Sequence, residues 1–312
     1  MGFDNGTEVT EFILLGFSGF GFLQGHLFWG VLCIYVVTLL GNSLIILLTL
    51  ADSALHSPMY FFLRHFSVVE ILYSTTIVPR MLADLRSSCP TIPRASCFTQ
   101  MYFFALFGVA ECCLLTAMAY DRYAAICCPL QYTTLMNQVT CASLVGASYF
   151  AGIITGTIHS VCIFTLPFRG ANTIHHFLCD IPPVLRLASA STFWGEVGKL
   201  FITVAFIFTP FLLIVASYTC IIATILGVAT SEGRQKIFST CSSHLFVVIL
   251  FYGTATAAYI RPQEDSLGDK DQILSIFYTV VTPMCNPFVY TLRNKEVIGA
   301  MRRLMKRYLG GR

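Results

Sequence analysis

Apolar residues dominate seven stretches of the chain, each long enough to cross a lipid bilayer as a helix. Crossing a hydrocarbon core of roughly 30 Å takes about 20 helical residues. Shorter segments richer in charged residues, proline and glycine separate the stretches. The pattern predicts an all-α membrane protein, a seven-transmembrane helix bundle with spans at His26–Leu50, Pro58–Val78, Ser96–Tyr123, Val139–Phe164, Val197–Leu226, Phe238–Ile260 and Gln272–Leu292.

The composition agrees with a membrane protein. Of the 312 residues, 56% are hydrophobic and 11% are charged, whereas a soluble protein has roughly 25% charged residues. A water-soluble globule of this length could not bury so much apolar surface, and a bilayer is the alternative solvent. The net charge of +3 is small and scattered, which argues against a nucleic-acid partner, because phosphate binding needs clustered basic residues.

The basic residues outside the spans predict the orientation. With the N-terminus outside, the cytoplasmic side holds eleven Lys and Arg residues against four acids, and the outside holds eight against ten. This distribution follows the positive-inside rule. Asn5 lies in a glycosylation acceptor, Asn5-Gly6-Thr7, which also requires the outer side. We expect a multi-pass plasma-membrane protein with an extracellular N-terminus at 1–25, a bundle at 26–292 and a cytoplasmic helix and tail at 293–312.

The C-terminal segment is amphipathic. It predicts a short cytoplasmic helix that lies on the anionic inner leaflet, with membrane lipids as partners. The alternative is a solvated tail. The apolar face holds Val297, Ile298, Met301, Leu304, Met305 and Tyr308, and the basic face holds Arg302, Arg303, Lys306 and Arg307.

Most of the thirteen cysteines lie within the spans, where cysteine acts as a small hydrophobic residue. Only Cys89, Cys97 and Cys179 fall in the predicted outer loops. A Cys97–Cys179 disulfide would hold the loop between spans four and five over the bundle. Cys89 is then left over, either as a free thiol or as a competitor for Cys97.

Two carboxylates fall within the spans. Glu70 lies 12 residues after Pro58 and Glu111 lies 11 residues before Arg122, so both reach a similar depth, about 16–18 Å from the cytoplasmic end. Buried ionisable groups in a membrane usually have a partner or a function. Three alternatives stand: the pair holds a sodium ion, shares a proton, or is satisfied separately by hydroxyls and water. Catalysis is not expected, because no nucleophile lies nearby.

Five motifs carry a family resemblance. In this order along almost the whole chain, they resemble the olfactory receptors, which are rhodopsin-like G-protein-coupled receptors. Span six also has Tyr252 where many rhodopsin-like receptors have tryptophan, a departure typical of olfactory receptors. The motifs are Gly41-Asn42, PMYFFL at 58–63, MAYDRYAAICCPL at 118–130, KIFSTCSSHL at 236–245 and PMCNPFVYTLRN at 283–294.

The resemblance implies an odorant receptor that activates a heterotrimeric stimulatory G protein and raises cyclic AMP, with no enzymatic activity. It implies that Asp121 and Arg122 pair in the resting state and that Arg122 later meets the G protein beside Tyr218 and Tyr290. It favours a sodium or proton site at Glu70 and Glu111, and no other cofactor. The remaining positions of the expected activation switch are Tyr123, Asn286 and Pro287.

The resemblance also places a ligand pocket in the outer half of the bundle. Inward faces at helical spacing there are aromatic and aliphatic with a few hydroxyls, so we expect a small, mostly apolar volatile ligand. Helix packing is the alternative role for each position. The expected lining is Phe104, Ala105, Gly108 and Val109 on span three, Thr203, Phe206 and Ile207 on span five, Tyr252, Ala255, Thr256 and Tyr259 on span six, and Ile276 and Thr279 on span seven.

Alternatives remain open at the level of function. One is a rhodopsin-like receptor for a non-odorant metabolite, and the other is a transporter or channel, against which stands the absence of inverted repeats.

Two departures from the family pattern bear on local structure. Arg169 and Ser189 stand where the two cysteines of a second disulfide in the outer loop are usual. Arg64-His65 replaces a small polar pair, and the simplest interpretation is that the Arg64 side chain snorkels to the inner interface.

Overall fold

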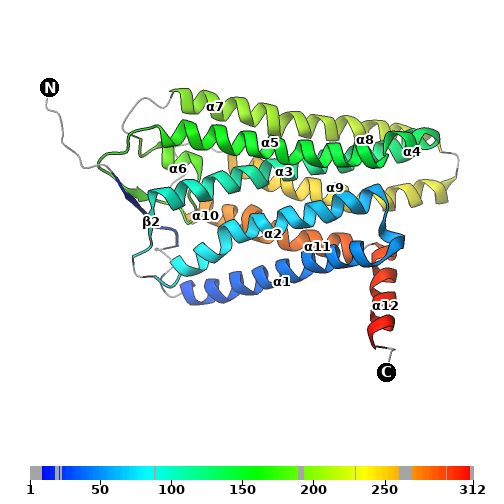
Figure 1. Ribbon diagram of the computed structural model, residues 1–312, viewed down its shortest axis with the longest axis horizontal. Helices are drawn as coiled ribbons and strands as arrows, with labels where there is room; N and C mark the ends of the chain where they lie inside the picture. The colour runs from blue at the N-terminus through cyan, green and yellow to red at the C-terminus, as the bar shows by residue number, and fades with distance from the viewer. Residues whose placement is uncertain are drawn as a thin grey trace.

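Seven helical rods form the bundle in the computed structural model, which describes residues 9–17, 21, 23–87, 89–188, 193–228, 230–259, 269–292 and 294–309. They run along a common long direction (Figure 1). In chain order the rods are α1 (Gln24–Ala51), α2 (Pro58–Asp84), α3 (Arg94–Cys127), α5 (Gln138–Phe164), α7 with η4 and α8 (Phe193–Thr203, Val204–Phe208, Thr209–Gly227), α9 (Ser231–Tyr259), and α10 with η6 and α11 (Asp269–Ile276, Phe277–Val281, Thr282–Leu292).

All seven predicted spans are helices. Six of the described helices are long and apolar enough to cross a membrane, while α9 has a shorter apolar part, Cys241–Thr256, after a polar first third. Two bounds differ most from the prediction: α9 begins at Ser231 instead of Phe238, and α2 passes through Pro79 to Asp84 instead of ending at Val78. A proline removes one backbone donor, but Ile77, Val78 and Met81 are buried around it, so packing maintains the helix.

Two rods contain a short π-helical segment that the sequence pattern did not predict. Val204–Phe208 (η4) joins α7 to α8, and Phe277–Val281 (η6) joins α10 to α11. An inserted residue of this kind rotates the following turns relative to the preceding ones, and π-bulges are frequent at functional sites. Both segments include positions from the expected ligand pocket.

Glycines allow α3 and α5 to approach closely. A Cβ atom on Gly152 would lie 2.3 Å from the Leu106 carbonyl oxygen, and one on Gly156 would lie 2.9 Å from the Tyr102 carbonyl oxygen. Side chains at these positions would force the two backbones apart. Gly41 on α1 has the same relation to Pro287 on α11, whose side chain a Cβ would meet at 2.8 Å.

A small sheet closes one end of the bundle, which the sequence pattern also did not predict. β1 (Glu11–Leu14) pairs antiparallel with β2 (Thr91–Pro93), with Phe12 opposite Ile92, and parallel with β3 (Thr173–Ile174). Phe12, Phe98 and Phe168 form a separate apolar core beneath it. The N-terminal segment and the loop after α5 therefore fold together, at the end where Figure 1 labels β2.

The opposite end carries short helices and α12 (Lys295–Leu309), which leaves the bundle at a steep angle (Figure 1). Val297 and Ala300 are buried, while Arg302 and Lys306 are exposed, which agrees with the amphipathic pattern. Met305, predicted on the apolar face, is an exception and is 46% exposed. The Nε of Arg303 donates to Asp52 at 2.8 Å, and this bond lowers the pKa of Asp52. The short helices are η2 (Ser53–Leu55), η3 (Pro129–Gln131) and α4 (Tyr132–Leu135) at this end, and α6 (Ile181–Leu185) at the sheet end.

Candidate functional site

Aromatic contacts surround the expected ligand positions on α3. The ring of Phe104 stacks on Tyr73 of α2 with centroids 5.4 Å apart. Gly108 lies one turn further along α3 and faces the same tyrosine, since a Cβ atom at Gly108 would lie 3.9 Å from the Tyr73 ring. Ala105 is half-buried and Val109 is buried. Sequence reasoning missed Tyr73, because nothing in the pattern of α2 distinguished it from other core residues.

Tyr252 connects α9 to this region. Its ring is buried and lies 5.0 Å from Phe211 of α8, and its hydroxyl lies beside the thiol of Cys112 on α3. Three helices therefore meet at one tyrosine. Phe211 and Cys112 were not among the predicted site residues, although each lies on an inward face of its helix.

The other predicted pocket positions are distributed unevenly. Phe206 and Ile207 lie in η4, and Thr279 lies in η6, where its hydroxyl donates to the Ser275 carbonyl at 2.6 Å. Thr256, predicted to face inward, has an exposed side chain. Tyr259 ends α9, and its side chain lies outside the described part of the structure. Thr203, Ala255 and Ile276 are half-buried.

A polar cluster lies at the middle of the bundle. Glu70 on α2 is fully buried and accepts a hydrogen bond from the side-chain amide of Asn286 on α11. Glu111 on α3 is 2% exposed and lies within Coulombic range of Glu70. The two buried carboxyl groups are therefore close enough to interact electrostatically, and no hydrogen bond between them is seen in the described part of the structure.

Several oxygen atoms in this region are buried without a hydrogen-bond partner. They include one carboxyl oxygen of Glu70, one of Glu111 and the amide oxygen of Asn286, together with the hydroxyls of Ser67 and Ser74. Such orphaned atoms are rare and call for a bound ion, water or proton. In the described part of the chain, no group of three or more His, Cys, Asp or Glu residues is arranged to hold a metal ion.

The charged pair at the α4 end of α3 is hydrogen-bonded within itself. Asp121 is fully buried, and Arg122 donates to its Oδ2 from Nε at 3.1 Å and from Nη2 at 2.5 Å. The hydroxyl of Tyr132 in α4 donates to Oδ1 at 2.8 Å. Burial and the Asp121 charge raise the pKa of Tyr132, so its proton stays in place. The pairing was predicted, whereas Tyr132 was not, because its loop carries no recognisable pattern.

Tyr218 and Tyr290 lie near Arg122 but are not bonded to it. The Tyr218 hydroxyl is 2.7 Å from Nδ1 of His244 on α9, whose Nε2 is 3.1 Å from the Leu115 carbonyl oxygen on α3. Tyr290 is 1% exposed and packs against Phe66 of α2. His244 therefore links α8, α9 and α3. Its place in the motif KIFSTCSSHL was the signal that could have identified it.

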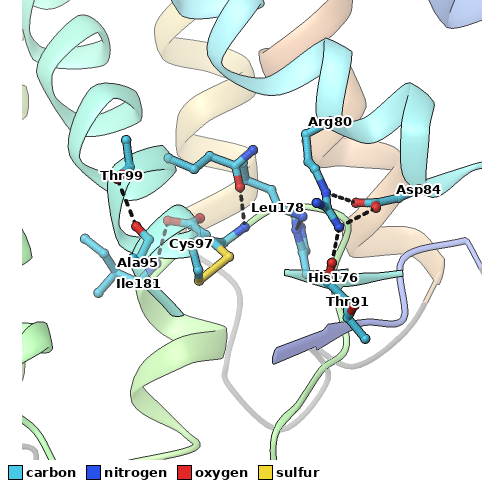
Figure 2. Close-up of a disulfide and its surroundings, with 12 residues drawn as sticks. Arg80, Asp84, Thr91, Ala95, Cys97, Thr99, His176, Leu178 and Ile181 are labelled. Carbon is cyan, nitrogen blue, oxygen red and sulfur yellow. Dashed lines mark hydrogen bonds and ion pairs between the residues drawn. A yellow bond between two sulfur atoms is a disulfide. The ribbon is translucent and has the colours of Figure 1, made fainter. Parts of the chain in front are cut away.

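The loop after α5 is fixed over the sheet end of the bundle. The predicted Cys97–Cys179 disulfide is present, with Cα atoms 5.5 Å apart, and Cys89 is free and exposed. Figure 2 draws the bridge together with Arg80, which forms a 2.7 Å ion pair with Asp84 and donates to the Thr91 carbonyl at 2.6 Å. The disulfide thus joins the loop to α3, and Arg80 joins α2 to β2.

His176 connects the same loop to α10. Its Nδ1 accepts from the Leu178 backbone amide at 3.1 Å, and its Nε2 is 3.1 Å from the Ser275 hydroxyl. The ring stacks on Phe177, which in turn stacks on Phe17 of the N-terminal segment. Burial lowers the pKa of His176 to about 4, so the ring is neutral at physiological pH.

The structure combines membrane-length helices with a bonded Asp121–Arg122 pair at the α4 end of α3 and a disulfide from α3 to the loop after α5. This combination is typical of rhodopsin-like seven-helix receptors. Comparison with known sequences is more specific. The sequence profile described as "Olfactory receptor" matches residues 31–307. The chain belongs to the olfactory receptor family, whose members are not enzymes.

Individual relatives match over nearly their full length. The chain is 85% identical to Olfactory receptor 10P22 of Mus musculus over 311 residues, covering 100% of both chains. It is 58% identical to Olfactory receptor 10P1 of Homo sapiens, covering 97% of each. It is 51% identical to Olfactory receptor 10A4 of Homo sapiens, covering 99% of each.

Proposed function

We propose that this protein binds a small, mostly apolar volatile odorant in the outer half of the bundle and activates a stimulatory G protein that raises cyclic AMP. The observation that carries the proposal is the aromatic set around Phe104, Tyr73 and Tyr252 in a chain of the olfactory receptor family. These side chains favour a ligand held by shape and apolar contact. The hydroxyls of Thr203 and Thr279 can add one or two hydrogen bonds.

Activation follows from differential binding. An odorant shifts the receptor only by binding the active arrangement better than the resting one. The resting arrangement holds Arg122 on Asp121, with Tyr132 as a second donor. When the helices separate, Arg122 is released toward the G protein, and Tyr218 and Tyr290 become its neighbours. The proposed orientation puts this end in the cytoplasm and the sheet end outside the plasma membrane.

We also propose a sodium ion at the Glu70–Glu111 cluster. The orphaned oxygens there are carboxylate, amide and hydroxyl atoms, which suit a hard cation. A bound ion would offset one of the two carboxylate charges and would favour the resting arrangement. A shared proton is the competing interpretation, and it makes a different prediction for the salt dependence of stability.

Sodium titration separates the two. Purified receptor should gain thermal stability when sodium chloride replaces choline chloride at constant ionic strength, because a ligand of the folded state stabilises it by mass action. Glu111→Gln should remove the gain. A thermal stability that depends on pH but not on sodium would instead indicate that the two carboxyl groups share a proton.

An odorant panel tests the main proposal. Cells expressing the chain with a cyclic-AMP reporter should respond to at least one volatile compound. Arg122→Ala should abolish the response while surface expression persists. Panel-wide silence with a response to a non-volatile metabolite would favour the alternative receptor class, and substrate uptake that ignores Arg122→Ala would contradict a receptor altogether.

A further inference from the structure

A pocket lies where α1 ends and α2 begins, on the face toward α12. It is lined by Thr49 of α1, by Leu55, His56 and Ser57 of the turn, and by Tyr60, Phe61 and Arg64 of α2. Its volume is about 170 Å³, room for roughly five or six waters at about 30 Å³ each. A phosphate group, with five non-hydrogen atoms, fits this space.

The pocket contains one arginine, Arg64, whose charge is not balanced by an ion pair with any described residue. It lies six residues after Pro58, so its Cα is about 9 Å inside the end of α2. Its guanidinium lies over the Phe61 ring at 5.4 Å, and among the described residues no carboxylate bonds to it. An arginine at this depth needs an anionic or hydrogen-bonding partner, and guanidinium favours phosphate.

The nearby acids are already engaged. Asp52 accepts from Arg303 and from the Ala54 amide. Glu296 accepts from the Tyr60 hydroxyl at 2.9 Å. Neither is bonded to Arg64, and the exposed Arg302 and Lys306 on α12 add positive charge at the same end of the bundle. The pocket is therefore electropositive and bordered by Leu55 and Phe61, an arrangement that suits a headgroup with attached acyl chains.

We propose that this pocket binds the phosphate headgroup of an anionic phospholipid, with Arg64 as its main contact and the Ser57 hydroxyl, which makes no helix-cap bond, as a second. The lipid source rests on the proposed orientation, in which the pocket lies at the anionic inner leaflet. Bound lipid would join α1, α2 and the start of α12. Tyr60 of α2 already accepts a hydrogen bond from Asn294, which directly precedes α12.

Photo-crosslinking tests the proposal on the full-length receptor. The receptor is placed in phosphatidylcholine nanodiscs containing a photoactivatable phosphatidylserine, and labelled peptides are mapped after equilibration in about 1 M salt, where the Debye length is about 3 Å. Exposed charges are screened there and a pocketed contact is screened less. Label should concentrate on the peptides around 49–64.

Arg64→Gln should reduce this label about tenfold, the usual effect of losing a charged hydrogen bond. Arg64→Lys should keep part of it. The matched control is Arg302→Gln, which removes one exposed charge outside the pocket and should change the label less than twofold at high salt. Unchanged label in Arg64→Gln, or an equal loss in Arg302→Gln, would overturn the proposal.

Two further experiments distinguish a bound lipid from a free anion and test whether the variant receptor is folded. Soluble glycerophosphoserine or inorganic phosphate that displaces the lipid would assign the pocket to a free anion and overturn the lipid assignment, whereas failure to compete supports it. Labelling by a photoactivatable diacylglycerol, which has acyl chains but no phosphate, should not depend on Arg64, and unchanged label there reports intact folding. The assay needs neither odorant nor G protein, so its failure leaves the odorant response unaffected.

Discussion

Asp121 is buried completely at the α4 end of α3, and two donors satisfy its carboxyl oxygens. Arg122 satisfies one oxygen, and Tyr132, from a different element, satisfies the other. Adjacent residues stay close in any conformation of the helix, so the Asp-Arg pairing alone says little about α4. The bond from Tyr132 is the one that a change in the position of α4 must break.

Tyr132→Phe should therefore raise basal signalling. The substitution removes one hydrogen bond to a buried charge, worth about 1.5 kcal/mol or more, which is roughly tenfold in the resting-to-active equilibrium. Basal cyclic AMP per surface receptor measures it. Tyr149→Phe is the control, because Tyr149 is a half-buried tyrosine that packs on His65 of α2. Equal basal signalling in both variants would show that Tyr132 does not restrain the resting state.

At the scale of elements, α3 and α5 depend on small residues. Gly152→Ala should destabilise the bundle by about 1–3 kcal/mol, the cost of overpacking, because the new Cβ would overlap the Leu106 carbonyl at 2.3 Å. Gly146→Ala on the same helix meets nothing within 4 Å and should be neutral or stabilising by about 0.5–1 kcal/mol. Thermal unfolding of the purified variants measures both, and a Gly152→Ala variant as stable as Gly146→Ala would contradict this packing.

Sequence patterns predicted those elements whose signal extends over many residues. The seven spans and the similar depth of Glu70 and Glu111 agree with the structure, because span length and depth follow from helical rise. The Cys97–Cys179 bridge also agrees, because few cysteines lie outside the spans. The sheet was missed because strands of two to four residues show no periodicity. η4 and η6 were missed for another reason: a π-helical insertion depends on packing between helices. The exposed side chain of Thr256 likewise depends on the rotation of α9.

At the scale of the whole molecule, one disulfide joins the outer loop to the bundle across 82 residues of sequence. Closing a loop of this size is worth about 4.5 kcal/mol in the chain-entropy estimate. Cys179→Ser should therefore strongly reduce surface expression and thermal stability. Cys89→Ser, at the exposed free cysteine, should leave both unchanged or improve them by removing a competing thiol. Loss of expression in Cys89→Ser but not in Cys179→Ser would mean that the native bridge uses Cys89.

His176 makes the closed outer end sensitive to acid. The ring is buried and neutral, with a pKa of about 4 in the folded protein against an ordinary value of 6.5. Because the folded pKa is lowered, the unfolded chain binds the proton first as pH falls. Stability from this residue is complete above about pH 6.5 and declines toward pH 4. At 1.36 kcal/mol per pKa unit, the full loss is about 3 kcal/mol.

The physical reason lies in the bonds of the ring. Protonated His176 could no longer accept from the Leu178 amide, and its charge would lie against Phe177 and Ser275 with no acid among its bonded partners. Acid should therefore loosen the loop from α10 and, through Phe17, the N-terminal segment as well. Hydrogen exchange of the loop peptides around 174–180, compared at pH 7 and pH 5, measures this after correction for the intrinsic rate.

His176→Gln should be less stable at pH 7 but should lose the additional acid-induced opening, since glutamine does not titrate. His175→Gln is the matched control, because His175 is adjacent but exposed, and it should keep the pH response of the unmodified receptor. A His176→Gln variant that opens with acid as much as the His175→Gln variant would assign the response to another group. The outer end would then be closed by the disulfide and the sheet, with His176 acting only as a packed aromatic ring.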